Sequence, residues 1–303
     1  MKPTISVITP SFNQGKFIKK TIQSVLSQDI EDLEYFVADG GSSDETIDIL
    51  SRFDDQIRWI SEPDDGQADG VNKGIIATRN DIIGWLNSDD VYYPGALKIV
   101  QSHFSADPNL MVLYGDADHI DTDDSVIETY HTKAWDYEHL KEVCYLCQPA
   151  VFFRREAVSR YGMLDPALNY CMDYEYWLRL GKHLPFKHIA IKLAGSRFYA
   201  ENKTLQHRMP VHREINDMML AKFNEVPTKW IFNYAHTVAD SKLGDNARSS
   251  DNLKYLQILI LESINSFIRW KKLPSAKDLR TLSTWVGKFG SLLKEASRQA
   301  INK

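Results

Sequence analysis

This 303-residue sequence has little cysteine and no long apolar run. Its three cysteines, an odd number, argue against a disulfide framework and fit a reducing compartment. No window reaches the ~18 uncharged apolar residues of a membrane-spanning helix, and the closest approach, residues 256–268, contains Glu262. The N-terminus lacks the apolar region and cleavage site of a signal peptide. We therefore expect a cytoplasmic protein.

Excess positive charge and two common nucleotide-binding motifs are also missing. A net charge of -5 and a pI near 6.0 give no basic footprint for phosphates, so we expect no nucleic-acid partner. Neither G-x-G-x-x-G nor G-x-x-x-x-G-K-[ST] occurs, which disfavours dinucleotide oxidoreductases and P-loop enzymes. Cys144 and Cys147 have C-x-x-C spacing, but no second pair completes a zinc site, so we interpret them as structural.

Up to about residue 120, short β-rich runs alternate with helical patterns, which is typical of βαβ units around a mostly parallel sheet. The expected strands there are residues 5–8, 35–38, 57–60, 82–86 and 111–114. Strands at 151–153 and near 186–194, with helices near 154–160 and 172–183, continue the same domain. After about residue 210 the pattern is helical, and Pro227 and Pro274 separate the expected helices.

Polar loops follow the first four expected strands, at residues 9–14, 39–44, 62–67 and 87–90. Ligands of such sheets bind outside the carboxyl ends of the strands, so we expect these loops to share one site. Ser42 and Glu45 have capping-box spacing, which predicts a structural role for part of the second loop at a helix start. Asp39 precedes that cap and is not explained by it.

Two adjacent carboxylates, Asp89 and Asp90, follow the fourth strand. Neighbouring carboxylates repel each other unless a cation or hydrogen bonds compensate, so the pair is a candidate site for a hard divalent metal. The tetrad 87–90 is equally suited to a turn or a helix cap before Pro94, and its spacing alone leaves both interpretations open.

Five stretches, in their order and spacing, resemble the family 2 glycosyltransferases with a GT-A fold, over about residues 3–205. The third and fourth stretches look most like the branch that builds bacterial O-antigens and other surface polysaccharides. The stretches are 5–14 (ISVITPSFNQ), 37–44 (VADGGSSD), 66–74 (GQADGVNKG), 85–90 (WLNSDD) and 172–177 (MDYEYW).

The resemblance implies an α/β protein of GT-A fold, with a Rossmann-like, mostly parallel central sheet flanked by helices. It implies a catalytic domain at 1–209, with the nucleotide-sugar half at about 1–118 and the acceptor half at about 119–209. A helical C-terminal extension, residues 210–303, would follow.

The resemblance also implies a nucleotide-sugar site in the polar loops. Asp39 would accept hydrogen bonds from the base, which suits a uracil imide, while the 9–13 loop packs around base and ribose. For Lys73, an ordinary surface position on the helix at about 67–79 is an equal alternative. The residues expected to bind the nucleotide sugar are Thr9, Pro10, Ser11, Asn13, Asp39, Gly66, Gln67, Asn72, Lys73, Asn87, Ser88 and Asp89.

In this family the last position of a D-x-D motif holds a divalent ion against the diphosphate, and here that position is Asp89. Asn87 at the first position is a departure, so Asp90 or water would complete a site for Mg²⁺ or Mn²⁺. Asp173 matches the family's base, which takes the proton of the acceptor hydroxyl during an inverting attack. The structural alternative for Asp173 is an aspartate in the first turn of a helix, favoured by the helix dipole.

Gln148 and Arg197 are candidates to contact the acceptor or the diphosphate, and a structural role for either stays open. The resemblance thus implies an inverting, metal-dependent glycosyltransferase that moves a sugar from a UDP-sugar to a glycan or lipid-linked saccharide in bacterial polysaccharide or lipopolysaccharide synthesis. One alternative is a sugar-1-phosphate nucleotidyltransferase, which would need a Gly-rich, basic N-terminal loop. The other is a non-catalytic sugar-nucleotide or glycan-binding module.

The end of the chain is basic although the whole protein is acidic. Residues 253–303 hold ten Lys and Arg against three Asp and Glu. One interpretation is a helix packed on the catalytic domain or on a second subunit. The other is an interfacial helix on the anionic inner face of the cell membrane, where a polyprenyl-linked acceptor would be presented. The apolar residues at helical spacing are Leu253, Leu256, Ile260, Ile264, Phe267 and Ile268.

Overall fold

The computed structural model describes the whole chain except residues 1, 201, 203–205, 245–246, 249–251 and 302–303. The chain divides into two compact units. The first consists of Met1–Leu140 and Cys144–Asn202, and the second of Lys141–Val143 and Lys203–Lys303. The domain boundary predicted at residue 209 lies in the first turn of the helix Arg208–Met218 and stays a prediction.

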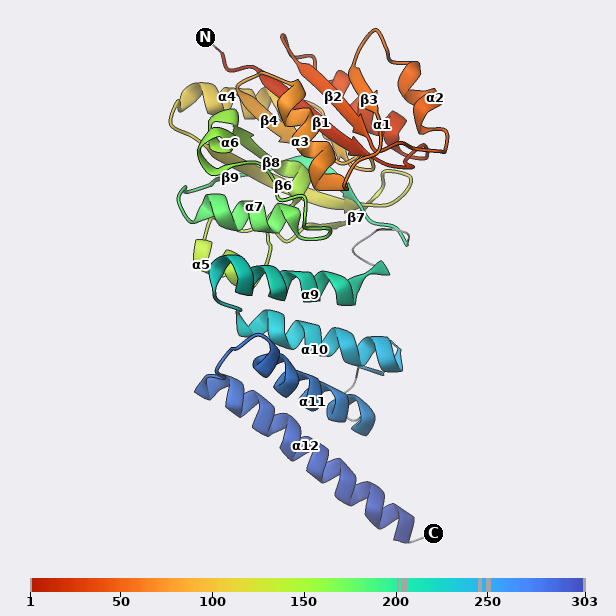
Figure 1. The fold of residues 1–303 in the computed structure, drawn as a ribbon, viewed down its shortest axis with the longest axis vertical. Coiled ribbons are helices and arrows are strands. Elements are labelled where there is room, and N and C mark those ends of the chain that lie inside the picture. Colours follow the sequence, from red (N-terminus) through yellow and green to blue (C-terminus); the bar gives the residue numbers. More distant parts are fainter. Residues whose placement is uncertain (1, 201, 203–205, 245–246, 249–251, 302–303) are drawn as a thin grey trace. The chain divides into compact units, whose positions relative to one another are not determined.

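In the described residues, the first unit holds a nine-stranded sheet with helices packed on it (Figure 1). The strands are β1 (Ile5–Ser11), β2 (Glu34–Asp39), β3 (Arg58–Ser61), β4 (Ile82–Trp85), β5 (Val91–Tyr92), β6 (Val112–Ile120), β7 (Val126–Thr129), β8 (Val151–Arg154) and β9 (Lys187–Arg197). The helices up to this point of the chain are α1 (Ile18–Leu26), α2 (Thr46–Ser51), α3 (Gln67–Ala77), α4 (Ala96–Ala106), α5 (Tyr137–Glu142), α6 (Arg155–Tyr161) and α7 (Met172–Gly181), with a 3₁₀ turn at Gln148–Ala150.

The strand order is β3-β2-β1-β4-β8-β6-β9-β5, and β7 pairs with β6 beside this path. β1 to β4 pair with one another in parallel, as do β6 and β9. The pairs that involve β5, β7 and β8 are antiparallel. The expected central sheet is therefore confirmed, but it is mixed rather than mostly parallel, and its parallel half is the half that carries the first four polar loops.

Helix α3 packs closely on β1 and β2 because glycine faces the sheet. A Cβ on Gly74 would lie 2.3 Å from Ile8 Cγ2, so a larger residue would push the helix away. This contact fixes the first residue of α3, Gln67, at the carboxyl edge of the sheet. The apolar core of this half includes Ile5, Val7, Ile18, Ile22, Val37, Ile82, Leu113 and Phe152.

The predicted strands and helices of this unit are confirmed, with ends that differ by a few residues. β5, β7 and α5 were not predicted, and all four residues of β7 are exposed, so no apolar alternation marks that strand. The capping-box prediction at Ser42 and Glu45 is wrong. Glu45 lies at the N-cap of α2 without a side-chain bond, and Thr46 N donates to Asp44 Oδ1 at 3.0 Å instead.

The second unit is helical, as predicted. Pro227 directly precedes α10, and Pro274 lies between the last two helices, so both prolines separate helices as expected. The helices are α9 (Arg208–Met218), a π-helical turn at Met219–Phe223, α10 (Thr228–Leu243), α11 (Leu253–Arg269) and α12 (Ala276–Ile301).

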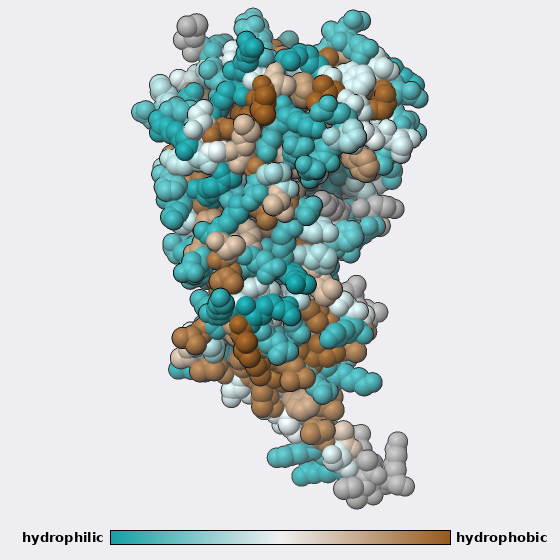
Figure 2. Space-filling model, in the orientation of Figure 1, coloured by the Kyte–Doolittle hydropathy of each residue, from teal (hydrophilic) through white to brown (hydrophobic). Residues whose placement is uncertain are grey.

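Helix α11 is apolar on two sides. It buries Leu256, Ile260 and Phe267 inside its own unit. Figure 2 shows apolar side chains gathered over α11 and α12. None of the described helices is both long and apolar enough to cross a membrane. The exposed apolar side chains of α11 are Leu261, Ile264 and Ile268, which are 55%, 45% and 73% exposed.

Candidate functional site

The carboxyl ends of β1, β2 and β3 place three polar side chains in a row. The strand register pairs Ser11 with Asp39, and Asp39 with Ser61. Asp39 is 2% exposed, and its Oδ2 accepts from Ser61 Oγ at 2.7 Å. Further bonds come from Ser42 N at 2.8 Å, Gly41 N at 3.1 Å and Ser42 Oγ at 2.5 Å. Ser11 Oγ is buried and has no hydrogen-bond partner among the described residues.

The loop after β1 is tied to the loop after β2. Asn13 N donates to Ser42 Oγ at 2.7 Å, and Asn13 Oδ1 accepts from Ser43 N at 2.9 Å. Asn13 has a φ of 52°, a left-handed conformation that asparagine tolerates better than most residues. The two loops therefore form one rim around Asp39.

Asn87 is the centre of a second group of polar contacts, after β4. Its Oδ1 accepts from Gln67 Nε2 at 2.7 Å and from Trp85 Nε1 at 2.9 Å. Its Nδ2 donates to Asp90 Oδ2 at 3.3 Å. An asparagine supplies both an acceptor and donors, whereas an aspartate here would repel Asp90. The departure from D-x-D thus matches the surroundings of the side chain.

Asp89 and Asp90 are desolvated carboxylates held close together. Burial raises the pKa of Asp89, while a hydrogen bond from Tyr199 OH to Oδ2 at 3.0 Å opposes that shift. Burial and the neighbouring Asp89 charge raise the pKa of Asp90 well above its usual value. Both Asp90 oxygens are engaged, Oδ1 with Arg197 N at 2.8 Å and Oδ2 with Asn87. Asp90 is therefore anchored within the protein.

The pair has the chemistry of a divalent-metal site, without a full set of protein ligands. Carboxylate oxygens suit Mg²⁺ and Mn²⁺, and a cation beside two desolvated carboxylates would lower both raised pKa values. No group of three or more His, Cys, Asp or Glu side chains among the described residues could hold a metal ion. A metal at Asp89 would therefore need further oxygen ligands from a bound diphosphate or from water.

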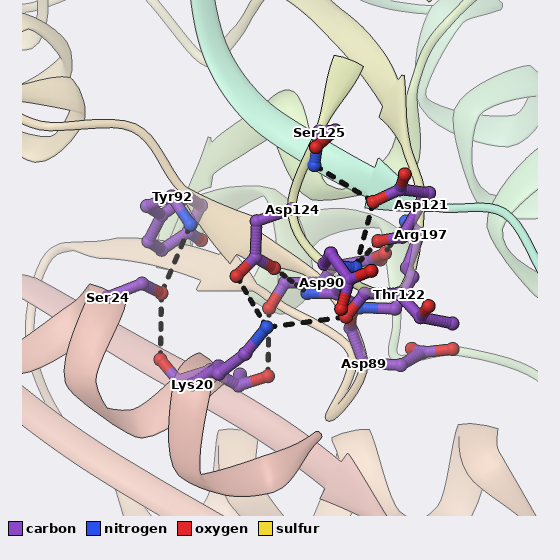
Figure 3. A network of polar contacts seen from close by, with 12 residues as sticks. Lys20, Ser24, Asp89, Asp90, Tyr92, Asp121, Thr122, Asp124, Ser125 and Arg197 are labelled. Carbon is purple, nitrogen blue, oxygen red and sulfur yellow. Dashed lines mark hydrogen bonds and ion pairs between the residues drawn. The ribbon is translucent and has the colours of Figure 1, made fainter. Parts of the chain in front are cut away.

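Arg197, at the end of β9, ties the 87–90 turn to two other segments (Figure 3). It is 1% exposed, and its Nε donates to Asp89 O at 2.7 Å. Its guanidinium also donates to Asp121 O and, at 2.5 Å, to Asp124 Oδ1. Asp124 in turn pairs with Lys20 Nζ of α1 at 2.6 Å. Contact of Arg197 with acceptor or diphosphate stays a prediction, and it would require these bonds to break.

Asp173 lies in the first turn of α7, where its Oδ1 accepts from Tyr174 N at 2.7 Å. Burial raises the pKa of the Cys147 thiol, and the charges of Asp90 and Asp173 raise it further. Both carboxylates therefore lie within electrostatic range of one thiol. Gln148 donates Nε2 to Trp85 O at 2.6 Å, and its buried Oε1 has no partner among the described residues.

The predicted nucleotide-binding side chains of Thr9, Asn72 and Lys73 also have partners in the protein. Thr9 is 0% exposed, and its hydroxyl pairs with a tyrosine hydroxyl at 3.2 Å. Asn72 donates to Leu164 O at 2.9 Å and accepts from Leu164 N at 3.1 Å. Lys73 Nζ forms ion pairs with the carboxylates of Glu62 at 3.0 Å and Asp69 at 3.5 Å. These contacts agree with the alternative in which Lys73 is an ordinary surface residue of the helix. Nucleotide contacts of these side chains stay predictions.

The remaining predicted nucleotide-binding positions, Pro10, Gly66 and Ser88, lie at strand ends or in the loops that follow them. Pro10 and Ser88 are buried, at the end of β1 and in the turn after β4. Gly66 precedes α3 with a φ of 107°, which favours glycine, and its N donates to Asp64 Oδ1 at 2.9 Å. Burial raises the pKa of Asp64.

Three residues near these contacts were not predicted: Phe12, Asp64 and Tyr199. Phe12 is 60% exposed on the loop after β1, and an aromatic residue in a loop that is expected to bind a nucleotide is a signal that the sequence does contain. Tyr199 reaches Asp89 from a segment 110 positions away, and no local pattern marks that contact. Asp64, whose Oδ1 accepts from Gly66 N, lies in a loop rich in acidic residues, so the sequence does not distinguish it from its neighbours.

The sequence profile of glycosyl transferase family 2 matches residues 6–162. Among curated relatives, the chondroitin synthase of Escherichia coli is 27% identical over 70% of this chain and 31% of that protein. The hyaluronan synthase of Pasteurella multocida is 23% identical over 76% of this chain and 26% of that protein. The chain thus spans less than a third of the length of these relatives.

Two solved structures share the fold. TarS residues 1–349 of S. aureus, in complex with UDP-GlcNAc, gives a TM-score of 0.60 at 14% identity, over 98% of this chain and 92% of that chain. A mannosyltransferase from Pyrobaculum calidifontis, in complex with GDP-Man and Mn²⁺, gives a TM-score of 0.58 at 16% identity, over 100% of this chain and 88% of that chain. The predicted GT-A fold is confirmed.

Proposed function

The chain belongs to glycosyl transferase family 2, and from that premise we propose that it transfers a sugar from a UDP-sugar to a saccharide acceptor, with inversion at the anomeric carbon. The observation that carries the proposal is that Asp39 ends one of the two parallel strands that flank β1 and the 87–90 turn follows the other, while the charges of Asp90 and Asp173 both raise the pKa of the Cys147 thiol. Asp39, the turn and Asp173 would supply base recognition, a metal ligand and a proton acceptor. The product would be part of a bacterial surface polysaccharide or lipopolysaccharide.

Asp39 would recognise the nucleotide base. Its carboxylate offers about four lone-pair sites, and four donors of the protein already use them. Two of these donors are serine hydroxyls, which can rotate, so a uracil imide N–H would replace one of them. The exposed ring of Phe12 beside this loop would stack on the base. The complex of TarS with UDP-GlcNAc supports a UDP-sugar as donor.

Asp89 would be the main protein ligand of Mg²⁺ or Mn²⁺, with the donor diphosphate completing the coordination. The cation would neutralise the charge that builds on the diphosphate leaving group. Asp90 would act mainly through its bonds to Arg197 N and Asn87, which hold the turn in position. The complex of the Pyrobaculum calidifontis mannosyltransferase with GDP-Man and Mn²⁺ supports this assignment.

Asp173 would take the proton of the acceptor hydroxyl as that oxygen attacks the anomeric carbon from the face opposite the diphosphate. Its oxygen already accepts one hydrogen bond, from Tyr174 N, which orients the carboxylate in the first turn of α7. A single base without an opposing nucleophile gives inversion. Gln148, with an unsatisfied buried oxygen near Trp85, would orient the donor or the acceptor.

The acceptor would be a glycan or a polyprenyl-linked saccharide, presented at the cytoplasmic face of the membrane. The exposed apolar residues and the basic charge of the C-terminal helices support a peripheral contact with anionic lipid. A homodimer through the same helices is the second candidate. The family match argues against a nucleotidyltransferase, and the loop after β1 is neither Gly-rich nor basic.

The test is a donor hydrolysis screen. Purified protein is incubated with a panel of nucleotide sugars and Mn²⁺, and nucleotide release is measured without any acceptor. We expect release of UDP from at least one UDP-sugar, and loss of that release when EDTA is added. Release of GDP alone would overturn the donor assignment. Binding of nucleotide sugars without any release would support the non-catalytic module instead.

A further inference from the structure

A cluster of three rings, His119, Tyr130 and Phe198, lies beside the candidate site and has no part in the transfer described so far. The His119 ring centroid is 5.1 Å from that of Tyr130 and 5.2 Å from that of Phe198. Tyr130 OH donates to Leu146 O at 3.3 Å. Phe198 is 42% exposed, so the cluster ends in an aromatic ring that is open to solvent.

The chain around Phe198 connects the cluster to the 87–90 turn. Phe198 lies between Arg197 and Tyr199, and the side chains of both neighbours contact Asp89. The ring of Phe198 itself contacts His119, so this residue lies between the 87–90 turn and the ring cluster.

Tyr130 connects the cluster to the candidate base. Burial raises the pKa of the Tyr130 phenol well above its usual value, and the charge of Asp173 raises it further. Asp173 therefore lies within electrostatic range of that phenol. The charges of Asp90 and Asp173 both raise the pKa of the Cys147 thiol. A hydrogen bond with Ser196, two positions before Phe198, lowers it. The cluster thus adjoins the turn through the neighbours of Phe198, and the charge of Asp173 acts on its Tyr130 phenol.

One polar atom of the cluster is unsatisfied. His119 Nδ1 is buried and has no hydrogen-bond partner among the described residues. Buried polar atoms without partners are uncommon, and each calls for a ligand, a water or another explanation. A neutral imidazole nitrogen can accept from a hydroxyl or donate to one, depending on its tautomer.

We propose that Phe198, His119 and Tyr130 form the acceptor subsite, and that its ligand is a pyranose ring. A pyranose has an apolar C–H face and a rim of hydroxyls, which match an exposed aromatic ring and an unsatisfied imidazole nitrogen. A ring bound there would lie next to the 87–90 turn, and one of its hydroxyls would lose a proton to Asp173. The inference rests on the proposed function, because the subsite has a use only if a sugar is transferred at this edge.

The test is saturation-transfer-difference NMR with a panel of methyl glycosides in the presence of UDP and Mn²⁺. At least one glycoside should bind the wild type, and Phe198→Ala should raise its Kd about tenfold because the exposed ring is lost. Phe198→Tyr keeps the ring and should bind like the wild type. Ile191→Ala removes a side chain of β9 that is 41% exposed, and serves as the matched control.

UDP affinity of each variant, measured by calorimetry, shows whether the fold and the donor site are intact. The subsite is overturned if no glycoside binds the wild type, or if Phe198→Ala binds glycosides as the wild type does. The donor hydrolysis screen separates this result from failure of the proposed function. If the wild type releases nucleotide but Phe198→Ala binds glycosides unchanged, the subsite alone is refuted. If the wild type releases no nucleotide from any donor, the transfer itself is refuted.

Discussion

Tyr199 donates its phenolic hydrogen to Asp89 Oδ2 over 3.0 Å, across 110 positions of sequence. The ring of Tyr199 also packs on Phe17, with centroids 5.0 Å apart. Asp89 is therefore oriented by the protein, while burial raises its pKa. The pKa of Asp90 is raised further, but both of its carboxylate oxygens are bonded within the protein, so Asp89 is the residue to test first as a metal ligand.

Asp89→Asn should weaken Mn²⁺-dependent UDP binding and slow turnover, because it removes a charged oxygen ligand opposite the diphosphate. Calorimetry with and without EDTA measures the metal-dependent part of the UDP affinity. Asp55→Asn, which changes an exposed carboxylate in the turn before β3, is the matched control. Identical UDP affinity with and without EDTA, in wild type and Asp89→Asn alike, would sink the metal assignment.

Asp173→Asn should abolish most transfer while leaving UDP binding intact, because it removes the base and spares the nucleotide loops. General-base catalysis contributes ~10²–10⁴-fold, so kcat should fall by a factor in that range. Glu156→Gln, an exposed acidic residue in the first turn of α6, controls for the loss of a favourable helix-dipole interaction. A transfer rate within about threefold of wild type would show that Asp173 is structural.

The sequence predicts those parts of the site that local patterns mark along the chain. Strand ends and the loops after them are local patterns, so Asp39 and the 87–90 turn could be assigned to one edge from periodicity and the rule for parallel sheets. The partners of those residues are distant in sequence and carry no local signal. Thr9 illustrates the limit: a loop position by pattern, its side chain faces the interior and pairs with Tyr35 at 3.2 Å.

The wrong capping box at Ser42 has a similar cause. Its side chain fits a helix cap by spacing, but the buried carboxylate of Asp39 needs hydrogen-bond donors more than the helix needs a cap. Ser42 therefore bonds to Asp39, and Asp44 serves the start of α2. A pattern of three or four residues predicts which bonds a side chain can make, and the fold decides between them.

Arg197→Met should destabilise the first unit by about 2–4 kcal/mol, because it removes the bonds of a buried guanidinium to Asp89 O and Asp121 O and leaves Asp124 with Lys20 as its cationic partner. Lys20→Met cuts an ion pair whose side chains are 42% and 41% exposed, so it should cost less than about 1 kcal/mol. Thermal unfolding followed by circular dichroism compares the two variants. Equal losses of stability would show that the Arg197 contacts add nothing beyond surface charge.

The second unit should lose stability as the pH falls. Burial lowers the pKa of His212 and of His236 to about 4, from the usual 6.5. Below pH 6.5 these histidines take up protons in the unfolded chain but stay neutral in the folded chain. The free energy of unfolding is therefore largest above pH 6.5 and falls as the pH drops toward 4. The loss is on the order of 2–3 kcal/mol for each histidine. Thermal midpoints at pH 7.5 and 5 measure it.

His212→Leu should reduce that pH dependence by about half, since leucine does not titrate and His212 Nδ1 has no hydrogen-bond partner among the described residues. His131→Gln, at an exposed histidine of the first unit, is the control. If the midpoint of His212→Leu falls with pH as steeply as that of the wild type, burial of this histidine does not govern the acid response.

The C-terminal helices should bind anionic membranes in a salt-sensitive way. Leu261, Ile264 and Ile268 form one exposed apolar row on α11, since they recur at three- and four-residue steps. Residues 253–303 carry a net charge of +7, from ten basic and three acidic side chains, and each basic residue near an anionic surface contributes on the order of 1 kcal/mol. Sedimentation with phosphatidylglycerol vesicles at low and high salt measures the binding, and truncation after residue 250 should abolish it.

Replacing the three exposed residues of this row by Ser separates membrane binding from a loss of folding, because all three are at least 45% exposed. Val126→Ser and Ile127→Ser on β7, 56% and 53% exposed, remove comparable apolar surface from the first unit and should leave sedimentation unchanged. Light scattering of the same variants measures oligomeric state. Wild type that stays in solution with vesicles at low salt, but becomes monomeric when the α11 row is replaced, would identify the row as a dimer interface and refute membrane binding.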